Sequence, residues 1–231
     1  MILYTYAIVV ENDTGSSQTY TILQERPHIS PEISRLENTH SGTITMQAKA
    51  PNEQTVAFTL YRTYYAMCGS SQSGQIGDAS VLVFGEKPVT LGTTSSDSPG
   101  STVLVSAIDG TLQFDEMELP AGGFQNSFEI RTSNTFTSEE AKENKYMVGF
   151  GVSVSNTNEE SNGPSSLFTP EPNKTYQINP STVLYLTYGS YAKDGVIDIS
   201  KAEKLLKINF DVTKERVTVI HDADNEPSIQ T

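Results

Sequence analysis

Apolar and polar residues alternate along most of this chain, and the longest such run extends over 55–69, TVAFTLYRTYYAMCG. One parity is mainly apolar, and the other is a mixture of Ala, Thr, Tyr and Met. Because successive side chains of a strand point to opposite faces, this period predicts a long β-strand with one buried face and one mixed face. The Val, Thr and Tyr content also favours a strand over a helix. We expect the fold to be built around this strand.

Shorter alternating runs follow one another along the chain, separated by turns rich in Gly, Ser, Asn and Pro. About thirteen such strands, spaced by roughly 8–15 residues, predict an antiparallel β-sandwich that is either jelly-roll-like or a partly closed barrel. No linker-like composition divides the chain, so we expect a single domain over residues 1–231.

Turn sequences predict two hairpins. The pair Asp109-Gly110 interrupts an alternating run over 102–114, and this dipeptide suits a two-residue type I′ turn. A segment rich in Asn, Asp and Gly separates the runs at 2–10 and 18–25, which are expected to form the second hairpin.

Residues 137–144, TSEEAKEN, are the best helix candidate. Thr137 and Glu140 have the spacing of a capping box, in which each side chain bonds the other residue's backbone amide. Such a short helix is not stable alone, so we expect it to pack on a sheet.

Two features interrupt the pattern in the second half of the chain. Gly149 and Gly151 share one parity of a predicted strand, and glycine in a strand often marks a bulge or the close approach of another group. Residues 156–174 form the longest segment without alternation, and we expect them to be an irregular loop.

Composition excludes several classes of partner. The chain has 28 acidic and 15 basic residues, a net charge of −13, which repels phosphate backbones and anionic lipid surfaces. We therefore expect no nucleic acid as a partner, and no stretch approaches the ~20 apolar residues of a membrane-spanning helix. The first residues lack the basic region of a signal peptide, so we expect a cytoplasmic or otherwise intracellular location, with a secreted form that has lost its leader as the alternative.

The single cysteine, Cys68, excludes an intrachain disulfide. It lies at the end of the long predicted strand. We interpret it as a small buried hydrophobic residue rather than a nucleophile, because no sequence motif supplies the general base that a nucleophilic cysteine needs. Nucleotide, zinc and serine-hydrolase motifs are absent as well, so we expect no cofactor.

Arg62 falls on the parity predicted to face inward, where a guanidinium is costly unless it meets a carboxylate or a ligand anion. The alternative is a β-bulge near Tyr61 that turns Arg62 outward, or packing over a tyrosine ring. Tyrosines in the predicted strands can line a cavity or a sugar-binding surface, or can simply pack in the sheet. The candidate ligand-binding residues are Arg62, Tyr61, Tyr64, Tyr65, Tyr185 and Tyr188.

Near the end of the chain, His221, Asp222 and Asp224 follow a predicted strand and are candidate metal ligands. A proline takes the sixth position of the acidic stretch, where an EF-hand loop needs glycine, so the interpretation is an irregular calcium site or a solvated turn. A second hypothetical metal site would bring His28 and His40 together with His221.

Three functions remain open on this pattern. The first is a soluble, non-catalytic β-sandwich that binds a small molecule, a glycan or a protein. The second is an enzyme without a motif, of cyclase or isomerase type, that shapes an apolar substrate in a tyrosine-lined pocket. The third is a pore-forming β protein, since Ser- and Thr-rich alternating strands can form a membrane barrel. The sequence does not indicate an oligomeric state.

Overall fold

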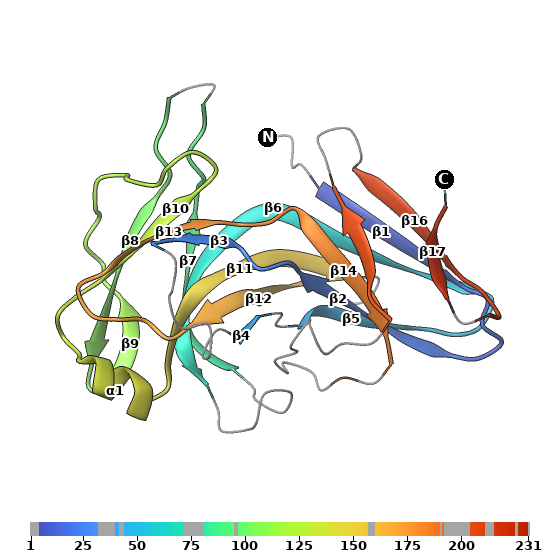
Figure 1. The fold of residues 1–231 in the computed structure, drawn as a ribbon, viewed down its shortest axis with the longest axis horizontal. Helices are drawn as coiled ribbons and strands as arrows, with labels where there is room; N and C mark the ends of the chain where they lie inside the picture. The colour runs from blue at the N-terminus through green and yellow to red at the C-terminus, as the bar shows by residue number, and fades with distance from the viewer. Residues whose placement is uncertain are drawn as a thin grey trace.

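The fold of the described residues is all-β with one short helix, which confirms the predicted class (Figure 1). Strands form three sheets with mainly antiparallel pairing, and none of the sheets closes into a barrel within the described residues. No helix among them is long and apolar enough to cross a membrane. The computed structural model describes residues 5–31, 40–41, 44–71, 81–94, 97–156, 160–189, 191, 204–210, 215–224 and 226–230.

The largest sheet contains the predicted long strand, which is the 18-residue β6 and lies at its centre. Its eight strands are β1 (Thr5–Asn12), β4 (His40–Ser41), β6 (Gln54–Ser71), β7 (Val81–Val89), β11 (Tyr146–Asn156), β12 (Glu160–Phe168), β16 (Arg216–His221) and β17 (Pro227–Ile229). They lie in the order β17-β16-β1-β6-β11-β12-β4, and β7 also pairs with β6.

Two smaller sheets pack on the apolar face of the large one, at opposite ends of the molecule (Figure 1). The five-stranded sheet has the order β3-β13-β10-β8-β9, and the four-stranded sheet has the order β15-β14-β2-β5. The bounds of their strands are β2 (Gln18–Gln24), β3 (His28–Ser30), β5 (Ile44–Ala50), β8 (Thr102–Ile108), β9 (Thr111–Phe114), β10 (Phe128–Thr132), β13 (Thr175–Asn179), β14 (Val183–Tyr188) and β15 (Leu206–Asn209).

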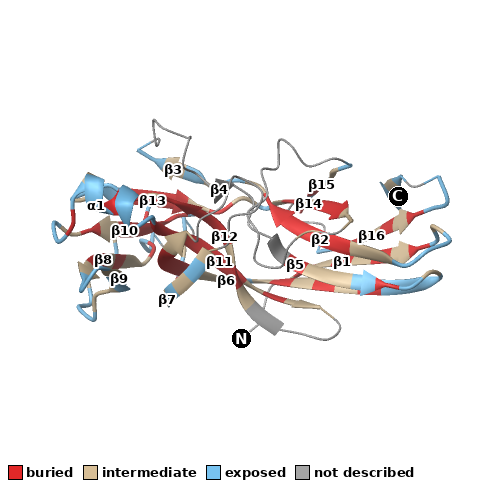
Figure 2. Ribbon diagram, turned by 90° about the horizontal axis from the view of Figure 1, so that it is seen from below, coloured by how far each residue is buried: buried red, intermediate tan, exposed pale blue. Residues whose placement is uncertain are grey.

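One apolar cluster joins all three sheets and forms the core. It includes the fully buried rings of Phe58 and Phe150 from the large sheet, Tyr20 from β2 and Phe128 from β10. In Figure 2, buried residues follow most of β11, and in β6 they occur on either side of Tyr61–Tyr65, whereas the helix is mostly exposed. The predicted apolar parity of β6 is therefore the face that carries both smaller sheets.

One of the two predicted hairpins is confirmed. β8 and β9 pair with Ile108 opposite Thr111, and both turn residues have positive φ, 51° for Asp109 and 75° for Gly110. A type I′ turn needs positive φ at both positions, which explains the Asp-Gly sequence.

The other hairpin prediction was wrong, because the first two strands separate into different sheets. β1 pairs with β6 and, in parallel, with β16, whereas β2 pairs with β14 and β5. The turn between them is local, but the strands find distant partners.

The prediction of an irregular loop over 156–174 was also wrong, because much of this segment is β12, which pairs with β11 and β4. Its sequence, ESNGPSSLF, has no alternation and contains a proline. Pro164 is tolerated because the register with β11 shifts between Phe150 and Gly151, and prolines within sheets occur at such bulges.

The predicted helix is confirmed as α1 (Ser138–Glu143), with Thr137 as its N-cap. The Thr137 hydroxyl accepts from the amide of Glu140 at 3.1 Å, and the Glu140 carboxylate accepts from the amide of Thr137 at 2.7 Å. Ala141 is the buried residue of the helix, which packs against β11 as expected.

Replacement of Thr137 by Ala removes the N-cap acceptor, and we expect it to lower the free energy of unfolding by about 1 kcal/mol. Urea denaturation followed by circular dichroism measures this loss. Glu143→Ala, in the same helix but outside the capping box, is the control and should be near neutral. Equal effects of the two substitutions would contradict a capping role.

Candidate functional site

The candidate site lies where one edge of β6 has no strand partner among the described residues. β1 pairs with residues 54–61 of β6, and β7 pairs with residues 64–71 of the same edge. On the other edge, the register with β11 shifts between Val152 and Val154, opposite this point. Arg62 and Thr63 therefore lie between the described parts of β1 and β7, beside an irregularity in the pairing with β11.

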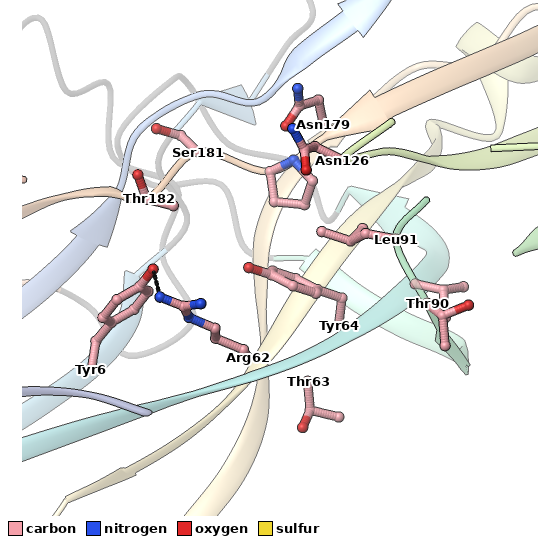
Figure 3. Close-up of a pocket in the computed structure, with 12 residues that line it drawn as sticks. Tyr6, Arg62, Thr63, Tyr64, Thr90, Leu91, Asn126, Asn179, Ser181 and Thr182 are labelled. Atoms are coloured by element: carbon pink, nitrogen blue, oxygen red, sulfur yellow. Dashed lines mark hydrogen bonds between the residues drawn. The ribbon is translucent and has the colours of Figure 1, made fainter. Parts of the chain in front are cut away.

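Arg62 is exposed and lies against Tyr6 of β1 (Figure 3). Its guanidinium carbon is 4.5 Å from the centre of the Tyr6 ring, and Nη2 donates a hydrogen bond to the Tyr6 hydroxyl at 2.5 Å. Tyr6 is itself buried against Phe210, with ring centroids 4.5 Å apart. Arg62 was expected either to point inward, or to turn outward at a bulge or pack over a tyrosine ring. The structure has both a register irregularity and a tyrosine ring at this position.

Tyr64 lies next to Arg62 on the same face of β6, and its ring points toward the connection between β13 and β14 (Figure 3). Burial raises the pKa of the Tyr64 hydroxyl, Tyr6 acts in the same direction, and Arg62 opposes them. The hydroxyl is therefore protonated at neutral pH and can donate a hydrogen bond.

The β13–β14 connection, Asn179 to Thr182, forms one wall of the site. The carbonyl of Ser181 accepts from the Gln24 amide at 2.7 Å, and the hydroxyl of Ser181 donates to Glu25 at 2.9 Å. Gln24 is buried and also accepts from Ser165, the residue that the β12 irregularity displaces. These bonds fix the wall to β2.

A tight turn at Phe124–Ser127 forms the opposite wall. The amide of Ser127 donates to the carbonyl of Phe124 at 2.9 Å, and Asn126 has a φ of 57°. Positive φ at the third position of a turn is tolerated by Asn better than by most residues. The amide of Asn126 bonds the carbonyl of Gly92 at 2.8 Å, which holds the turn beside the end of β7.

Between these walls lies an open groove with a volume of about 770 Å³. Figure 3 shows the side chains of Arg62, Tyr64, Asn126, Asn179 and Thr182 around it, with Leu91 on one side. The side chains of Tyr64, Asn126, Asn179 and Thr182 make no hydrogen bond to any described residue. We call these four side chains together with Arg62 the groove set.

The structure separates the predicted tyrosines. Tyr61 lines a small cavity of about 10 Å³ that adjoins the groove, and its hydroxyl is 3.3 Å from that of Ser155. Tyr65 points to the other face of the sheet, where it packs against the small cluster of Met67, Met147 and Leu167.

The two tyrosines of β14 also lie outside the groove. Tyr185 donates to Glu25 at 3.0 Å, and the Tyr188 ring packs at a tilt against His221, with centroids 4.2 Å apart. Of the predicted ligand-binding residues, Arg62 and Tyr64 are the ones that line the groove.

The predicted metal ligands at the chain end point in different directions. His221 is buried, with Nδ1 2.9 Å from the Tyr20 hydroxyl. Asp222 and Asp224 are exposed, and Asp222 accepts from the Asp224 amide at 3.1 Å in a local turn. Within the described part of the chain, no three His, Cys, Asp or Glu side chains are grouped as metal ligands.

The second hypothetical metal site, made of His28, His40 and His221, includes one side chain outside the described residues. His28 is exposed at the start of β3, and the side chain of His40 lies outside the described residues. The buried position of His221 serves the core contact with Tyr20 and Tyr188.

Cys68 is buried on the apolar face of β6, with its sulfur 3.6 Å from the carbonyl oxygen of Leu112 in β9. Burial raises the pKa of the Cys68 thiol to about 12. This environment is that of a packed hydrophobic side chain, because a reactive cysteine needs an accessible, stabilised thiolate.

We expect native Cys68 to resist Ellman's reagent at pH 8. With its raised pKa, the thiolate fraction is about a thousandfold below that of an ordinary thiol. Absorbance of the released chromophore measures the rate, and the chain unfolded in guanidinium chloride is the control that should react within minutes. Comparable rates in the native and unfolded protein would show that Cys68 is accessible.

Sequence reasoning missed Asn126, Asn179 and Thr182. Each lies in or next to a turn, where Asn and Thr are common for purely local reasons. The sequence predicts the turns in which these residues lie. It does not predict which turns lie close together in the folded protein.

Residues 4–231 match the model of a protein family described as RhiA. No curated protein and no solved structure matches the chain.

Proposed function

This chain belongs to the RhiA family, and we propose that it is a non-catalytic binding protein that holds a small polar molecule in the groove beside Arg62. The observation that carries this proposal is the groove set, in which four side chains able to hydrogen-bond have no described protein partner. Elsewhere, polar side chains such as Gln24 and Glu129 are used up in bonds within the protein.

The size and lining of the groove support a small ligand. Its volume of about 770 Å³ lies within the ~300–1,000 Å³ typical of ligand pockets. Its open shape and polar side chains suit a hydrated ligand better than the apolar substrate of a cyclase, which would require a closed apolar cavity.

The walls are held in place before any ligand arrives. Gln24 and Glu25 fix one wall, and the turn at Asn126 fixes the other. A preformed site loses less conformational entropy on binding, which supports recognition of a small molecule with few contacts.

Protein-observed NMR with a panel of amino acids, organic acids and short saccharides tests the proposal. We expect at least one compound to shift the amide signals of 62–64, 90–91, 126 and 179–182 together. Asn126→Gly should lower the affinity for that compound, because glycine allows the positive φ of the turn and the substitution removes only the carboxamide. Thr175→Val, an exposed change in β13, is the control. A panel that shifts no groove signal would contradict the proposal.

A further inference from the structure

The described groove lining carries one charged side chain, that of Arg62. This is notable in a chain with 28 acidic and 15 basic residues, since acidic side chains are common elsewhere on the surface. The nearby carboxylate of Glu25 is occupied by Ser181, Tyr185 and Lys207. The charge that the described lining carries is therefore positive, which favours an anion at this place although the whole protein repels one.

The contacts of Arg62 orient its guanidinium. Tyr6 receives one of its five N–H donors and supports the face of the group, while Tyr6 is held by Phe210. A planar guanidinium matches a carboxylate through two parallel hydrogen bonds, and such charge-assisted pairs are stronger than neutral ones. One guanidinium also balances the single charge of a carboxylate better than the double charge of a phosphate monoester.

The rest of the groove set is neutral and able both to donate and to accept. Asn126 and Asn179 have carboxamides, and Thr182 and Tyr64 have hydroxyls. Sugar hydroxyls also donate and accept, so they complement these groups. Leu91 and Pro180 add apolar surface to the same lining, which suits the C–H face of a sugar ring.

Building on the binding function proposed above, we propose that the groove binds a saccharide that bears a carboxylate, a sugar of the uronate class. The carboxylate pairs with Arg62, and the ring hydroxyls bond the neutral members of the groove set. Tyr6 is a positioning residue, because it contacts the guanidinium and lies behind it.

Isothermal titration calorimetry with matched trisaccharides tests this class. The probes are the trimers of galacturonate and glucuronate, each compared with its neutral galactose or glucose counterpart. We expect at least one acidic trimer to bind about twofold to fivefold more tightly than its neutral counterpart, because a solvent-exposed charge pair contributes about 0.5–1 kcal/mol.

Variants of Arg62 separate its charge from its geometry. Arg62→Gln should remove the preference for the acidic trimer, and Arg62→Lys should keep only part of it, because lysine has the charge but not the planar fork. Arg62 is exposed, so both variants should keep the native thermal midpoint. If either Arg62 variant is unfolded, the uronate proposal is decided by the affinities of the unsubstituted protein for the acidic and the neutral trimers.

Three results would overturn the uronate proposal. They are equal affinity for the neutral trimer, an acidic preference that Arg62→Gln leaves intact, and no heat from either acidic trimer at millimolar concentration. Binding of a neutral trimer that Asn126→Gly weakens would remove the uronate proposal and support the binding function. If no saccharide binds and the NMR panel shifts no groove signal, both proposals are wrong.

Discussion

Glu129→Ala should destabilise the protein by about 3 kcal/mol, because it removes the acceptor at the centre of a buried polar network. Glu129 is 4 % exposed, on the face of β10 that points away from the core. Its Oε1 accepts from Nε of Arg131 at 2.6 Å and from the hydroxyl of Thr102 at 3.2 Å, and its Oε2 accepts from the amide of Gln177 at 2.6 Å.

Most of the expected loss of stability arises because Glu129→Ala leaves the donors of Gln177 and Arg131 without their acceptor. Gln177 is 7 % exposed, so its amide cannot reach bulk water easily. Arg131 has a side chain 43 % exposed and can be rehydrated, which keeps the expected loss at the lower end for a broken buried pair. Urea denaturation measures the change in the free energy of unfolding.

Two control variants isolate the cause. Glu129→Gln keeps the shape and one acceptor, so we expect a loss of about half that size. Glu171→Ala removes an exposed ion pair with Lys174 in which both side chains are largely solvated, and it should cost less than about 0.5 kcal/mol. A loss for Glu129→Ala no greater than for Glu171→Ala would show that the network does not stabilise the fold.

Gly149→Ala should cost about 3 kcal/mol or more, or prevent folding. A Cβ at this position would lie 2.0 Å from the carbonyl oxygen of Ser166 and 3.0 Å from the Cα of Leu167. These are backbone atoms of β12, so relief requires the two strands to move apart rather than a side chain to rotate.

Gly15→Ala is the matched control. Gly15 has a φ of 82° with no atom within 4 Å of an added Cβ, so only backbone strain of about 1 kcal/mol is expected. Thermal unfolding of the two variants compares steric overlap with conformational strain. A smaller loss for Gly149→Ala than for Gly15→Ala would mean that the sheet yields at this point.

The two glycines of β11 show how far a sequence pattern can lead. A bulge or the close approach of another group was expected there, and β12 does approach Gly149 closely while the register shifts at Gly151. The approaching strand itself was not predicted, because ESNGPSSLF has small polar residues where an alternating strand would have apolar ones. Those small residues suit the close contact that the glycines create.

The candidate site was half predictable. Arg62 and Tyr64 attracted attention because a charged residue interrupts an apolar parity and aromatic residues follow it. The walls of the groove come from turns around Asn126 and Asn179, more than 60 residues away along the chain. Their meeting depends on how the two smaller sheets lie on the large one, and no local pattern contains that information.

The sequence alone determined much of the local structure, although not β12. A period of two specifies a strand, Asp109-Gly110 specifies a type I′ turn, and Thr137 with Glu140 specifies a helix start, since each depends on residues that are close in the chain. The tertiary structure alone decided the partners of each strand, including the separation of β1 from β2 and, among the described residues, the interval between β1 and β7 at Arg62. Backbone groups pair in the same way whatever the side chains, so packing of the whole core selects among the pairings.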